Sequence, residues 1–138
     1  MLKIASFVFS LSVLPMVVHA HHSFSIYDRS TVHEIEGELI DVRWRNPHVM
    51  FTVRTEASDG QVQDWDIEAA AVYVVERAGL QASMFDGVSR IRAAGWRSPN
   101  GPTMQVTNIL LPNGTELLMA GRAENLWSED VAGIRLPA

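Results

Sequence analysis

Apolar and polar residues alternate along much of the chain, in short segments that turn-forming residues separate. Because successive side chains of a strand point to opposite faces, this alternation predicts strands with one buried face. In the second segment Val49, Phe51 and Val53 share a face, which we expect to point inward. Asn113 and Gly114 form the strongest hairpin signal. We expect strands at residues 34–44, 49–54, 62–68, 88–97, 104–111 and 115–120.

One interval, residues 70–78, breaks this alternation. Ala71, Val74 and Val75 recur there at helical spacing, and Gly79 follows as a helix stop. Three strands, a short helix, a further strand and a hairpin are the element order of an OB-type barrel. The sequence therefore predicts a mainly β fold, a small OB-type barrel of about five to six strands with one short helix.

The first predicted strand contains a shift of phase. Its apolar series ends at Leu39, and a second series, offset by one residue, begins at Ile40. A one-residue slip in a period of two predicts a β-bulge. Residues 45–48 then form a turn, because Pro47 cannot join the hydrogen-bond ladder.

Residues 1–20 are typical of a signal peptide, with a basic start, an apolar run at 4–18 and small or β-branched residues at the cleavage positions. The run is shorter than a membrane-spanning helix requires, and it contains Pro15. We therefore expect cleavage after Ala20 rather than a retained membrane span. The mature protein would begin at His21 and work in the periplasm or outside the cell.

Composition limits the remaining possibilities. The chain has 138 residues, 11 basic and 16 acidic residues and no cysteine. Its acidity argues against a nucleic-acid partner, which needs a basic surface. The lack of cysteine excludes disulfides, thiol catalysis and thiolate metal sites. We expect a signal peptide (1–20), an N-terminal arm (21–33), one OB-type barrel domain (34–121) and a C-terminal tail (122–138).

Two short motifs carry a resemblance to a known family. One is the AHHSF segment at residues 20–24, and the other is the WRNPH turn at residues 44–48. With Trp65 and Glu68 in the third strand, most of the mature chain resembles domain-of-unknown-function family 6152, a family of small secreted bacterial proteins. At the helix start, residues 69–71 are alanine, where the family usually has a Ser/Asn-Pro pair. The resemblance implies export and a small barrel, and no established activity.

The mature N-terminus is a candidate metal site. Cleavage after Ala20 would give His21 a free α-amine, which can chelate an ion together with the ring Nδ1. His48, on the turn that Pro47 rigidifies, is the natural third ligand, and His22 is the alternative. Nitrogen donors without a thiolate favour copper(II) over zinc, so copper is the cofactor that the sequence suggests. The competing interpretation leaves these histidines in solvent, packed beside a tryptophan or in hydrogen bonds of the turn.

Asp64, Asp66 and Glu68 form a row of carboxylates on one face of the third strand. Such a row can bind a hard cation or supply an acid–base pair. More often it is the solvated face of an antiparallel sheet, which is the interpretation we favour. We keep Glu68, the nearest to the helix, as a candidate functional group.

A surface of arginine and tryptophan is the alternative binding site. Guanidinium groups bind anions and indole rings stack on planar ligands, so this surface would take a partner protein or a small anionic or planar ligand. The residues of this predicted ligand face are Arg43, Trp44, Arg45 and Glu68, and Arg90, Arg92, Arg97, Trp65 and Trp96 could extend it.

The sequence predicts no catalytic residue, because it has no cysteine and no serine in a nucleophile-elbow context. We therefore expect a binding or accessory module rather than an enzyme. The preferred hypothesis is an exported domain that binds copper through His21, and the alternative is binding at the ligand face.

Overall fold

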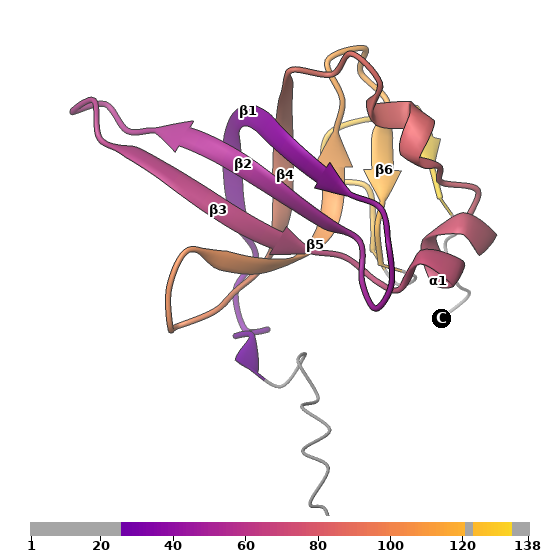
Figure 1. Cartoon of the computed structure of the whole chain (residues 1–138), viewed down its shortest axis with the longest axis horizontal. Coiled ribbons are helices and arrows are strands. Elements are labelled where there is room, and N and C mark those ends of the chain that lie inside the picture. The colour runs from indigo at the N-terminus through magenta and orange to yellow at the C-terminus, as the bar shows by residue number, and fades with distance from the viewer. Residues whose placement is uncertain (1–25, 121–122, 134–138) are drawn as a thin grey trace, which may run out of the picture.

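The computed structural model describes residues 26–120 and 123–133 (Figure 1). The predicted signal peptide, His21 and His22 lie outside the described residues. The elements, in chain order, are β1 (His33–Arg43), β2 (Met50–Glu56), β3 (Val62–Glu68), α1 (Val72–Arg77), the 3-10 helix η2 (Ala82–Phe85), β4 (Arg90–Arg97), β5 (Thr103–Leu110), β6 (Glu116–Leu118) and β7 (Val131–Ala132).

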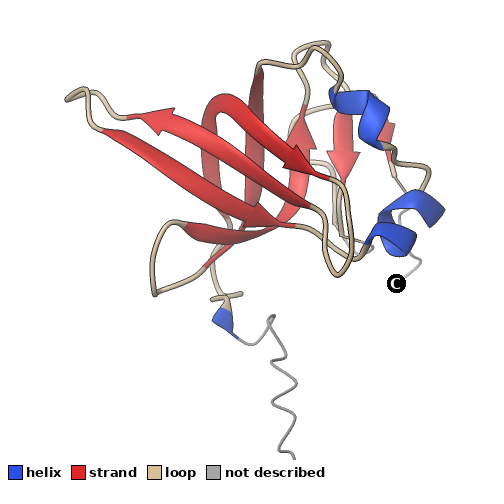
Figure 2. Ribbon diagram, viewed as in Figure 1, coloured by secondary structure: helices blue, strands red, loops and turns tan. Residues whose placement is uncertain are grey.

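Five of these strands close into a barrel. Their order is β3-β2-β1-β4-β5, and a parallel pairing of β3 with β5 completes the ring. The helix α1 lies between β3 and β4 in the chain, as in an OB-type barrel. In Figure 2, α1 and η2 lie on the same side of the molecule. The predicted fold class is confirmed.

The strand β1 bulges where the sequence shifts phase. Leu39 is opposite Val53, whereas Asp41 is opposite Thr52, so Ile40 is the extra residue. The predicted bulge is therefore confirmed. Ile40, the first residue of the second apolar series, is 41% exposed. The extra residue of a bulge is unpaired and free to turn outward.

Two glycines allow the barrel strands to approach closely. A Cβ atom on Gly37 would collide with the backbone carbonyl of Arg54, and one on Gly95 would collide with that of Gln105. Both positions therefore require a residue without a side chain, which suits strongly coiled barrel strands.

The core fills the barrel and extends beneath the helical segments. Val49, Phe51 and Val53 are fully buried, as the alternation in the second segment predicts. The Phe51 ring lies against Phe85 of η2, with 4.8 Å between the centroids. Val75 of α1 is also buried in this cluster. The helical interval thus covers one end of the barrel with apolar side chains.

The sheet continues beyond the domain boundary that we expected at residue 121. The strand β6 pairs with β5, and β7 pairs in parallel with β6, so the segment after residue 123 contributes to the same sheet. The described part of the chain contains no helix with the length and apolar character that a membrane crossing requires.

Candidate functional site

The turn after β1 brings His48 beside the end of β3. The Asn46–Pro47 peptide bond in this turn is cis. Directly after the turn, the Val49 amide donates to the Ala70 carbonyl (3.1 Å), and the Ala69 amide donates to the Val49 carbonyl (2.8 Å). These bonds extend the β2–β3 pairing past the end of β3. His48 is thereby fixed next to the last residue of that strand.

Three side chains from distant segments meet at this place, and we call them the Tyr27–Glu68–His48 cluster. Oε1 of Glu68 is paired with Nδ1 of His48, and Oε2 accepts a 2.9 Å hydrogen bond from the Tyr27 hydroxyl. Glu68 is 8% exposed and Tyr27 is 9% exposed, while a quarter of the His48 side chain remains exposed. The carboxylate is thus enclosed, and the imidazole extends from it toward the surface.

The protons of the cluster have defined places. Burial raises the pKa of Tyr27 far above its usual range, and the hydrogen bond to Glu68 and its negative charge act in the same direction. Tyr27 therefore stays protonated and donates to the carboxylate. A neutral imidazole carries one proton, and pairing of Nδ1 with a carboxylate places that proton on Nδ1. The lone pair of the His48 ring is then on Nε2.

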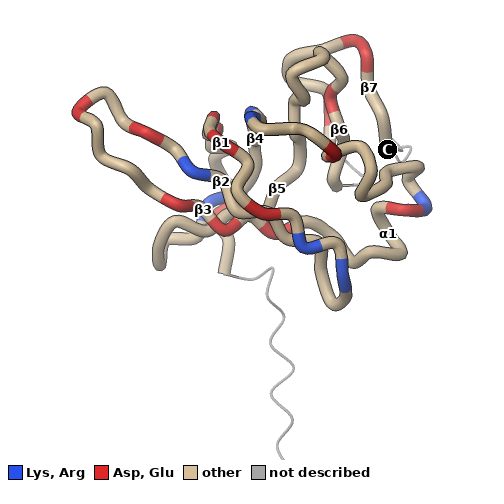
Figure 3. The backbone as a smooth tube through the Cα atoms, turned by 45° about the horizontal axis from the view of Figure 1, so that its top comes forward, with Lys and Arg blue, Asp and Glu red and all other residues tan. Residues whose placement is uncertain are grey.

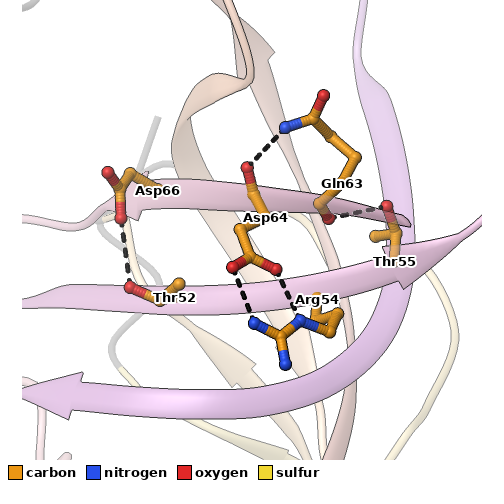
Figure 4. Close-up of polar contacts among 6 residues, drawn as sticks. All are labelled: Thr52, Arg54, Thr55, Gln63, Asp64 and Asp66. Carbon is orange, nitrogen blue, oxygen red and sulfur yellow. Dashed lines mark hydrogen bonds and ion pairs between the residues drawn. The ribbon is translucent and has the colours of Figure 1, made fainter. Parts of the chain in front are cut away.

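The carboxylate row of β3 divides into two kinds of residue, of which Figure 4 shows the two aspartates, Asp64 and Asp66. Asp64 makes a bidentate pair with Arg54, with N–O distances of 2.8 and 2.9 Å, and Asp66 accepts a 3.0 Å hydrogen bond from Thr52. Both aspartates are exposed, as expected for a solvated face. Glu68 differs because Tyr27 from the N-terminal segment covers it.

The cluster supplies part of a metal site. A carboxylate that holds one nitrogen of a histidine is the usual support of a histidine that binds metal through its other nitrogen. Among residues 26–120 and 123–133, no three histidines, aspartates or glutamates are grouped so as to hold an ion. A centre that includes His48 would need donors from outside this part of the chain, where His21 and His22 lie.

The structure places the four residues of the predicted ligand face in different environments. Trp44 packs 6.1 Å from the Phe85 ring and donates its indole N–H to Glu76 at 3.2 Å. Arg43 lies across β2 from Glu68, since both residues are paired with Met50. Arg45 is exposed, in the turn before His48.

The remaining arginines do not gather into a positive surface. Arg90 is paired with Glu36 at 3.0 Å, and Arg92 is paired with Glu34. Arg97 lies over the Trp65 ring, 5.2 Å from its centroid. Figure 3 shows basic and acidic positions intermixed along the backbone. These strands therefore present alternating charges rather than an anion-binding face.

Tyr27 is the member of the cluster whose role the sequence did not reveal. Tyr27 is 9% exposed, whereas its neighbour Ile26 is 48% exposed. The signal that could have identified its role is general, because a buried tyrosine hydroxyl nearly always needs a polar partner. The partner itself is 41 residues away, and no local pattern connects the two.

Comparison with known proteins agrees with the resemblance seen in the motifs. A model described as "Family of unknown function (DUF6152)" matches residues 9–107, which include the whole Tyr27–Glu68–His48 cluster and most of the barrel. No curated protein and no solved structure matches the chain. Because the match covers more than half of its length, the chain belongs to this family of unknown function, DUF6152.

Proposed function

We propose that this protein is an exported accessory domain that binds a copper ion between its mature N-terminus and His48. The observation that carries the proposal is the Tyr27–Glu68–His48 cluster, in which Glu68 holds Nδ1 of His48. A carboxylate in that position orients the ring and makes Nε2 a better ligand. The imidazole is also the part of the cluster that extends toward solvent.

Chain length allows the N-terminus to reach this position. His21 precedes Tyr27 by a short segment that spans at most about 20 Å when extended. The Tyr27 hydroxyl is bonded to the same carboxylate that holds His48. The docking of Tyr27 therefore keeps the α-amine of His21 within reach of His48, provided that cleavage occurs after Ala20.

The donor set determines the choice of metal. The amine and Nδ1 of His21 with Nε2 of His48 would form an all-nitrogen site, which copper(II) prefers among the common divalent ions. Metal must compete with protons for these nitrogens, and the ordinary pKa of an α-amine is about 7.7–8.0. Affinity should therefore fall as the pH is lowered through this range.

The alternative, an anionic ligand at the predicted ligand face, has weaker support. Arg43 is within 3.5 Å of Asp66, and Arg90 and Arg92 of β4 are paired with glutamates of β1. An anion would have to displace these carboxylates before it could bind.

The test is a copper titration of protein recovered after export, with its first residue established by intact mass. We expect it to bind copper(II) at least about tenfold more tightly than a peptide of residues 21–27. His48→Ala should reduce the affinity to that of the peptide. His33→Ala is the matched control, because it removes an imidazole from the start of β1, outside the cluster.

An extra N-terminal residue gives a second arm of the same experiment. It converts the α-amine of His21 into an amide while every side chain stays in place, so the affinity should fall. Equal affinities for folded protein, His48→Ala protein and peptide would refute the proposal, because the fold would then contribute no ligand. Retention of residues 1–20 in the exported protein would refute the amine as a donor.

A further inference from the structure

We infer that Glu68 and Tyr27 are positioning residues that set the tautomer of His48, and through it the metal affinity. This inference rests on the proposed function and adds to it the groups that prepare the ligand. A neutral histidine can carry its proton on either ring nitrogen. Without a hydrogen-bond partner, a fraction of the rings would therefore carry it on Nε2, the nitrogen that the metal needs. A carboxylate at Nδ1 removes that fraction, because it accepts a proton and cannot donate one.

Tyr27 determines which oxygen of Glu68 faces His48. Its hydroxyl donates to Oε2 of Glu68, and its pKa is raised well above the usual range, first by burial and then by the carboxylate. With Oε2 engaged, Oε1 is the oxygen that faces His48. The phenol therefore fixes the rotation of the carboxylate, which in turn fixes the proton on the imidazole.

The cost of burial also indicates a purpose beyond packing. Glu68 is 8% exposed, and enclosing a carboxylate requires hydrogen bonds that only restore what water provided. An apolar residue at the end of β3 would fill this place at lower cost. The charge is instead directed at an imidazole, whose proton position responds to it.

Substitution by glutamine separates the charge from the shape. Glu68→Gln keeps the size of the side chain but presents an amide that can donate to Nδ1. His48 then meets the amide best with its proton on Nε2, which blocks the nitrogen that the metal uses. Tyr27→Phe keeps the aromatic ring in the core and allows the Glu68 carboxylate to rotate. It should therefore change the His48 tautomer in the same direction as Glu68→Gln, but by less.

The first measurement needs no metal. Two-bond ¹H–¹⁵N correlation spectra of the metal-free protein should show His48 mainly protonated on Nδ1. In Glu68→Gln the signals should shift to the Nε2-protonated form, and in Tyr27→Phe they should show a mixture. Tyr73→Phe and Glu56→Gln are matched controls, because both residues are exposed and lie outside the cluster, and neither should change the His48 signals.

The second measurement is the copper(II) affinity of the same proteins. We expect Glu68→Gln to lose about 10–100-fold and Tyr27→Phe to lose less, while both controls bind as the parent does. An unchanged tautomer in Glu68→Gln would overturn the positioning role, whatever the metal does. A changed tautomer with unchanged affinity would show that His48 is not a ligand, which overturns the proposed function and leaves the role of Glu68 toward the ring intact.

Discussion

Two buried carboxylates bind segments that lie before and after the main barrel strands: Glu68 contacts Tyr27, and Glu116 contacts the loop at 126–128. Glu68 holds the N-terminal segment through Tyr27, and Glu116 holds the segment that leads to β7. Both carry a charge in a place where most residues are apolar. They differ in the chemistry of their partners, and this difference separates a structural anchor from a candidate site.

Glu116 is surrounded by donors that cannot change their role. It is fully buried, and Oε1 accepts from the Asn108 amide at 2.6 Å and the Leu126 N–H at 2.8 Å. Oε2 accepts from the N–H groups of Trp127 and Ser128, both at 2.9 Å. Burial acts to raise the pKa of Glu116, but these hydrogen bonds together lower it below its usual value. The group is therefore an ionised anchor for the C-terminal segment.

Glu68 has partners of another kind. His48 has a second ring nitrogen beyond the one that faces the carboxylate, and this nitrogen can bind a proton or a metal ion. A backbone N–H can only donate. A carboxylate that is buried only to stabilise the fold needs no other donors than these. The imidazole beside Glu68 makes its surroundings responsive to a proton or a metal ion.

The largest expected effect is the difference in stability between Glu116→Gln and Glu68→Gln. Glutamine at 116 would turn its NH₂ group toward backbone N–H donors, and each buried donor left unsatisfied costs about 1–3 kcal/mol. We expect Glu116→Gln to lower the free energy of unfolding by about 3–6 kcal/mol and Glu68→Gln by about 1 kcal/mol or less. Chemical denaturation at neutral pH measures both values.

Equal losses in the two variants would break the comparison. They would mean that Glu68 is as rigidly fixed as Glu116, and that the donor chemistry makes no difference. Asn125→Ala, in the same C-terminal loop, is a useful reference for Glu116→Gln, because it removes the 2.9 Å hydrogen bond from Asn125 to the Ser128 carbonyl and leaves the Glu116 side chain unchanged. It should cost less than Glu116→Gln.

A second prediction concerns the face of β2 that lies beside Glu68. Phe51 is fully buried, so Phe51→Ala should cost about 3–5 kcal/mol. Met50 lies opposite Glu68 and is only half-buried, so Met50→Ala should cost less than half as much. Denaturant melts compare the two variants directly. Similar costs would mean that Met50, on the Glu68 face of β2, is as much a part of the core as Phe51.

The sequence predicted what depends on neighbours along the chain. The alternation of Val49, Phe51 and Val53 gave the correct inward face, and the phase shift at Leu39 gave the bulge. The WRNPH motif likewise indicated the family to which the chain belongs. These features are local, because strand periodicity and turn chemistry are properties of adjacent residues.

The surroundings of individual charged residues could not be predicted from such local patterns. Asp64, Asp66 and Glu68 are equivalent in the strand pattern, and Tyr27, far away in the sequence, encloses only the last of them. Glu116 resembles an ordinary charged residue beside a hairpin turn, until the loop at 126–128 closes over it. Both outcomes depend on tertiary contacts that no short pattern encodes. His48 was proposed as a ligand on its turn, but its support by Glu68 became apparent only in three dimensions.

The smallest expected effect is a change in the response to acid. A carboxyl group whose pKa is lower in the folded protein stabilises the fold above its unfolded-state pKa, about 4.3 for glutamate, and this contribution is lost as the pH falls through the folded value. Glu116 has such a lowered pKa, so the parent protein should lose stability in this acidic range. Glu116→Gln cannot take up that proton, and its stability should fall less steeply with acid. The difference in slope for a single group is at most about 1.4 kcal/mol per pH unit, which urea denaturation at a series of pH values can resolve. Parallel curves for the two proteins would mean that Glu116 titrates alike in the folded and unfolded chains, and the contrast between a fixed anchor and a responsive cluster would then rest on Glu68 alone.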